Sequence, residues 1–192
     1  NLVYDGRAAK VMLNQDKVRQ IEEYYAQCEL EGANEHQVEE SQKAVAKMEV
    51  IIGDTDRLRA VAEDFIKHYE NRVAEGATIA GKAMFVCSNR NIAYDFYKIV
   101  KKLRPEWTEK KICDDGVVLS EKDKKELKPM EKIKLVMTRN KDDEKDLFDM
   151  LGTKEDRKEF DRQFKNPKSN FKIAIVVDMW LTGFDVPELD TI

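Results

Sequence analysis

Polar residues that could bind a phosphate, a sugar or a cation follow one of the most apolar runs of the chain. After the run Phe171 to Val177 come Asp178, Thr182, Gly183 and Asp185. A glycine lets the backbone approach a ligand closely, a threonine offers a hydroxyl, and a carboxylate accepts hydrogen bonds from sugar hydroxyls or binds a cation. The same residues also fit a plain turn in which Gly183 adopts positive φ and Asp185 only caps, so on these residues alone both interpretations stay open.

Two other apolar runs end in similar chemistry. Ser88-Asn89-Arg90 follows the run Ala83 to Cys87, and Thr138-Arg139-Asn140 follows the run Ile133 to Met137. Taken singly, each triplet fits an ordinary helix cap or loop. The carboxyl ends of parallel strands meet at one edge of a sheet, where open α/β sheets bind ligands. Together the three strand ends predict a surface that binds the phosphate groups along one strand of a nucleic acid.

Two other patterns resemble phosphate or metal sites, but their context excludes them. The stretch Gly76 to Ala83 matches G-x-x-x-x-G-K, yet an alanine replaces the hydroxyl residue that would bind magnesium. A helix precedes this stretch and a strand follows it, which is the reverse of a phosphate loop. Asp115 with Asp123-Lys124-Lys125 resembles a nuclease metal site but lacks a strand to present it, and its alternating charges are typical of a solvated loop.

Helices between the apolar runs must bring the three strand ends together. Ser88 or Asn89 is predicted to cap an amphipathic helix that runs to Leu103 and stops before Pro105. A second helix is predicted from Lys154 to Phe164. Fully apolar strands separated by helices predict an α/β fold, with a parallel sheet covered on both faces.

The rest of the chain is predicted to be helical or irregular. Residues 7–75 carry helix formers, no proline and apolar residues at helical spacing, with Asp54 or Thr55 as the cap of one helix, and residues 2–4 fit a short strand. Residues 106–130 are polar and lysine-rich, so we expect a poorly ordered surface excursion. These patterns predict a helical segment at 1–80 and an α/β domain at 81–192.

Composition limits the classes of function. The 192 residues include 34 Lys+Arg and 38 Asp+Glu, which gives a net charge of -4. The protein has no overall excess of positive charge that would attract DNA, so any DNA contact must be local. Cys28, Cys87 and Cys113 form no C-x-x-C pair, and His36 and His68 have no second metal ligand at a suitable spacing. No run approaches the ~20 apolar residues of a membrane span. We therefore expect a soluble cytoplasmic protein without a metal site or membrane partner, and the initial Asn1 leads us to expect a piece of a longer chain.

The candidate residues also carry a family resemblance. The segment KIAIVVDMWLTGFDVPELDTI is similar to motif V of superfamily-two helicases and translocases. Asp178, Gly183 and Asp185 match the core of that motif, whereas Val177 and Thr182 stand where it has Thr and Arg. The same segment looks specifically like the restriction (R) subunit of type I restriction-modification enzymes. GKAMFVCSNRNIAYDFYKIV resembles motif IV of that subunit, KEDRKEFDRQFKNPKSNFKIAIVVD its helix before motif V, and MEVIIGDTDRLRAVAEDFIKHYENRV a segment before motif IV.

The resemblance implies the second RecA-like motor domain of a subunit that pumps double-stranded DNA with ATP and Mg²⁺ and then cuts it. It implies that Gly183 and Asp185 face an ATP cleft shared with the first RecA-like motor domain. Asp178 and Thr182 would couple that cleft to the DNA. The remaining implied partners are the modification and specificity subunits, and the residues implied to bind the DNA backbone are Ser88, Arg90 and Thr138.

The implied activity belongs to the full-length subunit. This chain has no Walker A loop, no acidic Walker B motif and no motif VI arginines, so we expect it to be inactive alone, with no catalytic residues and no bound cofactor. Two alternatives stay open. One is a self-contained nucleotide-binding enzyme of flavodoxin-like topology, and the other is a noncatalytic interaction module that binds through the helices of residues 7–75.

Overall fold

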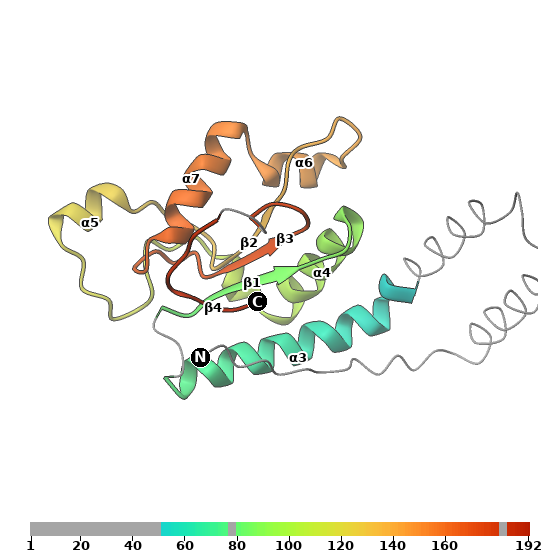
Figure 1. The fold of residues 1–192 in the computed structure, drawn as a ribbon, viewed down its shortest axis with the longest axis horizontal. Coiled ribbons are helices and arrows are strands. Elements are labelled where there is room, and N and C mark those ends of the chain that lie inside the picture. Colours follow the sequence, from blue (N-terminus) through green and yellow to red (C-terminus); the bar gives the residue numbers. More distant parts are fainter. Residues whose placement is uncertain (1–50, 77–79, 181–183) are drawn as a thin grey trace, which may run out of the picture. The chain divides into compact units, whose positions relative to one another are not determined.

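The computed structural model describes residues 51–76, 80–180 and 184–192. The chain divides into two compact units, Asn1–Val61 and Ala62–Ile192, with the boundary inside helix α3. The described elements, shown in Figure 1, are α3 (Thr55–Ala74), β1 (Lys82–Val86), α4 (Arg90–Leu103), η1 (Pro105–Thr108), α5 (Glu121–Glu126), β2 (Ile133–Val136), α6 (Lys145–Leu151), α7 (Lys154–Lys165), β3 (Ile173–Val176) and β4 (Leu189–Thr191).

The strands of the second unit form one parallel sheet in the order β2-β3-β1-β4. The first three are aligned without any shift, because Val176 of β3 pairs with Val86 of β1 on one side and with Val136 of β2 on the other. The ladder continues past β1, where the Cys87 amide donates to the Val176 carbonyl at 2.8 Å. The carboxyl ends of β1, β2 and β3 therefore lie level at one edge of the sheet.

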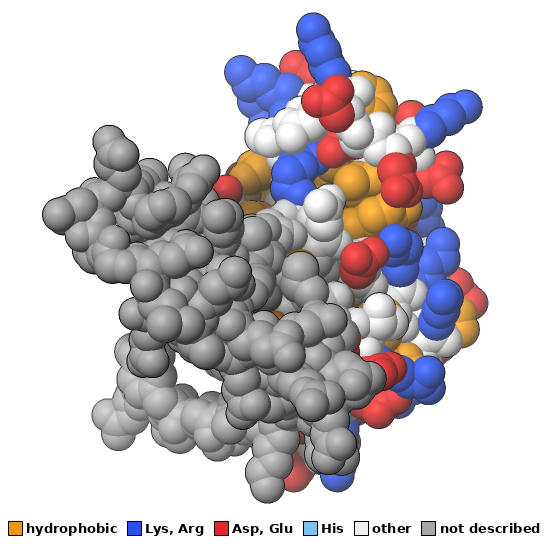
Figure 2. All heavy atoms as spheres, turned by 90° about the vertical axis from the view of Figure 1, so that its right-hand side faces the viewer, with side chains coloured by type: hydrophobic (Ala, Val, Ile, Leu, Met, Phe, Trp, Pro, Cys, Tyr) orange, Lys and Arg blue, Asp and Glu red, His pale blue; other side chains and the backbone are white. Residues whose placement is uncertain are grey.

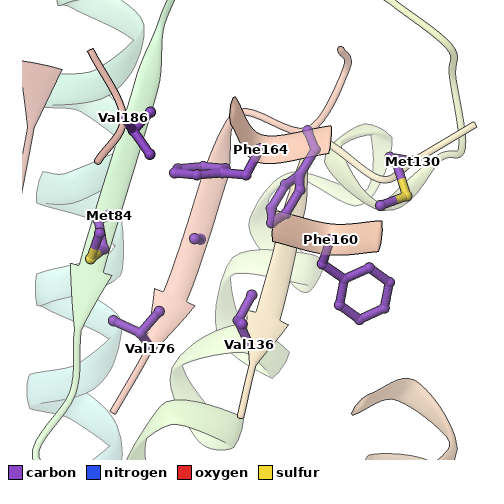
Figure 3. Packing of buried hydrophobic residues seen from close by; sticks show 9 residues of the cluster. Met84, Met130, Val136, Phe160, Phe164, Val176 and Val186 are labelled. Carbon is purple, nitrogen blue, oxygen red and sulfur yellow. The ribbon is translucent and has the colours of Figure 1, made fainter. Parts of the chain in front are cut away.

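Helix α7 covers one face of the sheet. Phe160 and Phe164 of α7 belong to the same buried cluster as Met84, Val136 and Val176 from three strands, as Figure 3 shows. Phe164 has none of its surface exposed to solvent. These side chains alternate with those of the opposite face along each strand, which is the arrangement that a sheet buried on both sides requires.

Helix α4 and the second half of α3 cover the other face. Phe85 of β1 stacks on Phe96 of α4 with ring centroids 3.9 Å apart, and Phe65 of α3 meets Phe85 edge-on at 5.1 Å. Tyr69 of α3 donates its hydroxyl to the Gly81 carbonyl at 2.8 Å, just before β1 begins. The predicted α/β fold with a parallel sheet flanked by helices, of the RecA-like class, is thereby confirmed.

Helix caps that the sequence predicts are also present. The Asn89 side chain accepts from the Ile92 amide at 2.9 Å and caps α4, which ends at Leu103 before Pro105. Asp54 accepts from the Arg57 amide at 3.3 Å at the start of α3. The final segment, from Leu189, forms the short strand β4.

The polar segment 106–130 is folded, so the expectation of poor order is wrong. Trp107, Leu127 and Met130 are buried and anchor the segment, and Met130 exchanges two backbone hydrogen bonds with Lys111. Lys168 donates to Asp123 of α5 at 2.6 Å. Three apolar anchors in a charged stretch are too widely spaced to produce a periodic signal, although most of the segment lies on the surface as expected.

Several predictions concern residues that lie outside the described part of the chain. They include the strand at residues 2–4 and the helices before residue 51, so the helical segment 1–80 stays a prediction. Among the helices that are described, none has both the length and the apolar composition needed to cross a membrane.

Candidate functional site

The carboxyl edge of the sheet gathers polar residues from three strand ends. We define the rim as residues 87–90, 137–140 and 177–178, which follow β1, β2 and β3. Ser88, Thr138 and Asp178 each lie two residues beyond an aligned valine, and all three are exposed to solvent. The parallel register therefore brings two hydroxyls and a carboxylate to one edge, and their roles in binding stay predictions.

The first rim segment leads into the N-terminus of α4. Asn89 caps this helix, so the exposed Ser88 next to it is not the residue that caps. The first turn of α4 contains no acidic residue. The helix dipole and the first backbone amides therefore favour an anion at this end, with no carboxylate of the first turn to neutralise them.

Arg90 joins the first rim segment to the second. Its Nη1 donates to the Thr138 carbonyl at 2.6 Å, and its Nη2 donates to both carboxylate oxygens of Asp143 at 2.6 and 2.7 Å. The Asn140 amide donates to the same carboxylate at 2.7 Å. Arg90 is thus held by a carbonyl and a carboxylate from the loop after β2.

Sequence reasoning missed Asp143. It lies in the charged stretch Lys141 to Lys145, where no spacing rule links it to an arginine 53 residues earlier. The contact exists because β1 and β2 both pair with β3, which brings the loops after them to the same edge. Such a partner is found only once the order of the strands is known.

Arg139 has a different environment from its neighbours on the rim. Its guanidinium carbon lies 4.3 Å from the centre of the Phe148 ring of α6, and its Nε is buried without a hydrogen-bond partner. A cation over an aromatic face is held by the ring quadrupole. Arg139 therefore attaches the second rim segment to α6, while Thr138 remains exposed.

The loop after β3 is described at its two ends. Asp178 and Asp185 are both exposed, whereas Thr182 and Gly183 lie outside the described residues. Trp180 has a positive φ of 66° and stacks on Phe184 with centroids 4.2 Å apart and planes 6° from parallel. A bulky residue with positive φ is uncommon, and here aromatic stacking holds it in place.

The excluded motifs have structural roles. Lys82 begins β1, is fully buried and donates to the Phe171 carbonyl at 2.5 Å, so it belongs to the core. Asp123 accepts from the Ser120 amide at 2.8 Å in the capping box of α5, and Lys168 and Ser120 together hold the pKa of its carboxyl well below the ordinary range. Within residues 51–76, 80–180 and 184–192, no group of three or more His, Cys, Asp or Glu is placed to hold a metal ion.

Charges of both signs lie on the described part of the face that Figure 2 shows. Figure 2 shows acidic and basic side chains intermixed over the described part of this face, without one continuous basic surface. On the rim itself, burial raises the pKa of the Cys87 thiol to about 12. The thiol therefore stays protonated at neutral pH and does not act as a nucleophile. The exposed hydroxyls of Ser88 and Thr138 are able to donate hydrogen bonds, and their binding of an anion stays a prediction.

Comparisons with known proteins agree on one group of relatives. Residues 79–192, which contain every predicted site residue, match the family described as "Type I restriction enzyme subunit R domain 3". The chain is 32% identical over 153 residues to "Type I restriction enzyme HindI endonuclease subunit" of Haemophilus influenzae, which covers 80% of the chain. It is 36% identical over 161 residues, or 83% of the chain, to "Putative type I restriction enzyme MjaIXP endonuclease subunit" of Methanocaldococcus jannaschii.

The match covers a small part of each relative. The chain spans 13% of the length of both proteins. No solved structure matches the chain significantly.

Proposed function

The chain belongs to the family of type I restriction enzyme R subunits, and from this membership we propose that it is the second RecA-like motor domain of an ATP-dependent DNA translocase and endonuclease. The matched domain contains the parallel sheet and the whole rim. Both relatives are named as endonuclease subunits. In this proposal the motor domain moves double-stranded DNA, and other parts of the full-length subunit cut it.

The alignment of the three strand ends is the observation that carries the proposal. It brings the Ser88 and Thr138 hydroxyls to the edge of the sheet at which α4 begins. Hydroxyls and helix N-termini are common phosphate contacts, and such contacts position a protein on DNA without reading its sequence. A motor that moves along any sequence needs contacts of this kind.

Electrostatic attraction contributes to the proposed DNA binding only locally, through Arg90. Arg90 adds a guanidinium next to the two hydroxyl residues, and Asp143 neutralises part of its charge. Residues 81–192 carry 24 Lys+Arg and 22 Asp+Glu, and the charges on the described face are mixed, so this domain attracts DNA weakly at long range. DNA binding by the full-length subunit then depends on further contacts outside this chain.

ATP binds between this domain and the first RecA-like domain of the same subunit. Asp185, whose carboxylate is exposed, and Gly183 contribute the contacts from this chain, and Asp178 and Thr182 couple the nucleotide to the DNA. The Asp185 carboxylate fits a ribose hydroxyl as an acceptor, whereas the described residues offer no group of ligands for Mg²⁺. ATP hydrolysis supplies the free energy for movement, and this chain alone does not hydrolyse ATP because it lacks a phosphate loop.

The proposed partners follow from the family. The full-length subunit assembles with modification and specificity subunits and acts in the cytoplasm. Recognition of a target sequence belongs to the specificity subunit, so the contacts proposed for this chain do not read bases.

Removing the two rim hydroxyls tests the DNA role. In the full-length subunit, Ser88→Ala combined with Thr138→Ala should weaken duplex DNA binding about threefold to tenfold at constant salt, because two phosphate contacts are lost. Fluorescence anisotropy with several unrelated duplexes measures the effect, and the loss should be the same for each. The matched control is Thr108→Ala, which removes a partly exposed hydroxyl of η1 that donates to the Pro105 carbonyl, and it should leave binding unchanged. Unchanged affinity of the double variant, or a loss confined to one sequence, would refute the proposed contact.

A further inference from the structure

We propose that Asp143 is a positioning residue that acts through Arg90 to fix the spacing between the first and second rim segments. The inference rests on the proposed DNA-binding function, because it concerns how the rim is held ready for a phosphate backbone. Neither the motifs nor the family match points to this residue. Its place in the structure does.

The contacts around Asp143 form a closed clasp. Arg90 Nη2 donates to both of its carboxylate oxygens, and the Asn140 amide donates to one of them. Arg90 Nη1 donates to the Thr138 carbonyl at 2.6 Å. We use the term clasp for Arg90, Asp143, Asn140 and Thr138, and it connects the start of α4 with the loop that follows β2.

Burial strengthens the clasp. Only 6% of the Asp143 side chain and 26% of the Arg90 side chain are exposed to solvent. A partly desolvated ion pair with several hydrogen bonds is screened less by salt and holds its geometry better than an exposed pair. The loop 138–143 is thus folded around the guanidinium, which is consistent with a fixed structural element.

The clasp acts on the groups that are proposed to bind DNA. Arg90 lies two residues after Ser88, and it holds the backbone of Thr138 directly. The distance between the two hydroxyl residues therefore depends on the Arg90–Asp143 pair. Contacts to consecutive phosphates require such fixed spacing, because a loosely held group must be ordered when the ligand binds.

Asp143→Asn in the full-length subunit tests the inference, because the substitution has two opposite effects on DNA binding. The change removes a negative charge, which alone would tighten DNA binding, and it breaks the ion pair that holds the rim. We expect duplex DNA binding to weaken about fivefold to tenfold, with positioning outweighing charge. The charge-matched control is Glu121→Gln on α5, where an exposed carboxylate pairs with Lys124, and it should not weaken binding.

A double-mutant cycle shows whether Asp143 acts through Arg90. Once Arg90→Gln is present, adding Asp143→Asn should not weaken DNA binding further, because the clasp is already open and only the effect of the lost negative charge, a slight tightening, remains. Fully additive losses would overturn the proposed route. Unchanged or tighter binding by Asp143→Asn alone would also overturn it and would make Asp143 a simple neutraliser of charge.

Hydrogen exchange measured without DNA provides a second readout. Asp143→Asn should speed exchange of the amides of residues 138–143 about tenfold relative to Glu121→Gln, because the loop opens more often. Unaltered exchange would overturn the clasp. If the unmodified subunit bound no duplex DNA, the proposed function would fail together with the DNA role of Asp143, and exchange would still decide whether the clasp orders this loop.

Discussion

Lys82 is a charged side chain placed entirely inside the protein. Its Nζ donates to the Phe171 carbonyl and lies 5.2 Å from the centre of the Phe164 ring. Burial, followed by the nearby charge of Lys172, lowers the pKa of Lys82 to about 7, while Asp114 and Glu188 act in the opposite direction. At neutral pH the core therefore holds a lysine that is close to half protonated.

This pKa makes stability depend on pH. An unfolded lysine has a pKa of about 10.4, so between pH 7 and 10 the unfolded chain binds more protons at this position than the native chain. The free energy of unfolding should therefore rise with pH across this window, and the destabilisation is complete below pH 7. Burial also lowers the pKa of Lys172, which contributes with the same sign.

Lys82→Met should reduce this dependence on pH. In the variant, the rise in unfolding free energy between pH 7 and 10 should be smaller than in the parent by on the order of a few kcal/mol. Urea unfolding of the 192-residue chain at pH 7, 8, 9 and 10 measures it. Lys122→Met is the control, because 82% of that side chain is exposed. Parallel curves for Lys82→Met and the parent would show that Lys82 is not the titrating group.

Single residues were predictable where their role is local. The cap at Asn89 and the exclusion of Lys82 from a phosphate loop both follow from neighbouring residues along the chain. Asp143 could not be found in this way, because its partner Arg90 reaches it through two strand pairings. A helix cap can be predicted from a few neighbouring residues. A long-range ion pair can be predicted only when the order of the strands is known.

At the scale of elements, helix α7 supplies the main packing contacts on one face of the sheet. Phe164 contacts Phe171 at 4.9 Å between ring centroids and stacks on Trp180 at 5.2 Å. Trp180 in turn stacks on Phe184, so one α7 residue supports both described ends of the loop that follows β3. Packing of this helix therefore matters for the fold and for the third strand end of the rim.

Phe164→Ala should lower the free energy of unfolding by about 3–5 kcal/mol, because it leaves a cavity where a fully buried ring was. Urea unfolding of the 192-residue chain at constant pH measures the loss. Val118→Ala serves as the control, since 87% of Val118 is exposed and its truncation should have almost no effect. A loss below that of a typical surface substitution would mean that α7 is not packed as described.

Apolar runs predicted β1, β2 and β3 closely, because strands buried on both faces carry a continuous apolar signal. The predicted run Ala83 to Cys87 became β1 at Lys82–Val86, and Ile133 to Met137 became β2 at Ile133–Val136. The short helix α6 was not predicted. It spans seven residues, Lys145–Leu151, with only Leu147 and Leu151 buried, which is too short for a periodic pattern to stand out.

At the scale of the whole molecule, the chain matches a small part of much longer relatives. The family assignment rests on residues 79–192, and the chain spans 13% of its curated relatives. In the proposed function, the described domain supplies hydroxyls and helix amides that bind a polyanion and one side of a nucleotide cleft, and the phosphate loop comes from another part of the subunit. Motion along DNA would require this rim to hold the backbone while the cleft opens and closes.

ATP-driven displacement of a third DNA strand from a duplex tests this account most directly. The full-length subunit, assembled with its modification and specificity partners, would be compared with the same assembly carrying Ser88→Ala and Thr138→Ala. We predict that the variant still hydrolyses ATP but displaces the third strand much more slowly than the parent and than the Thr108→Ala control. Displacement at the parental rate would contradict the claim that the rim formed by β1, β2 and β3 holds DNA.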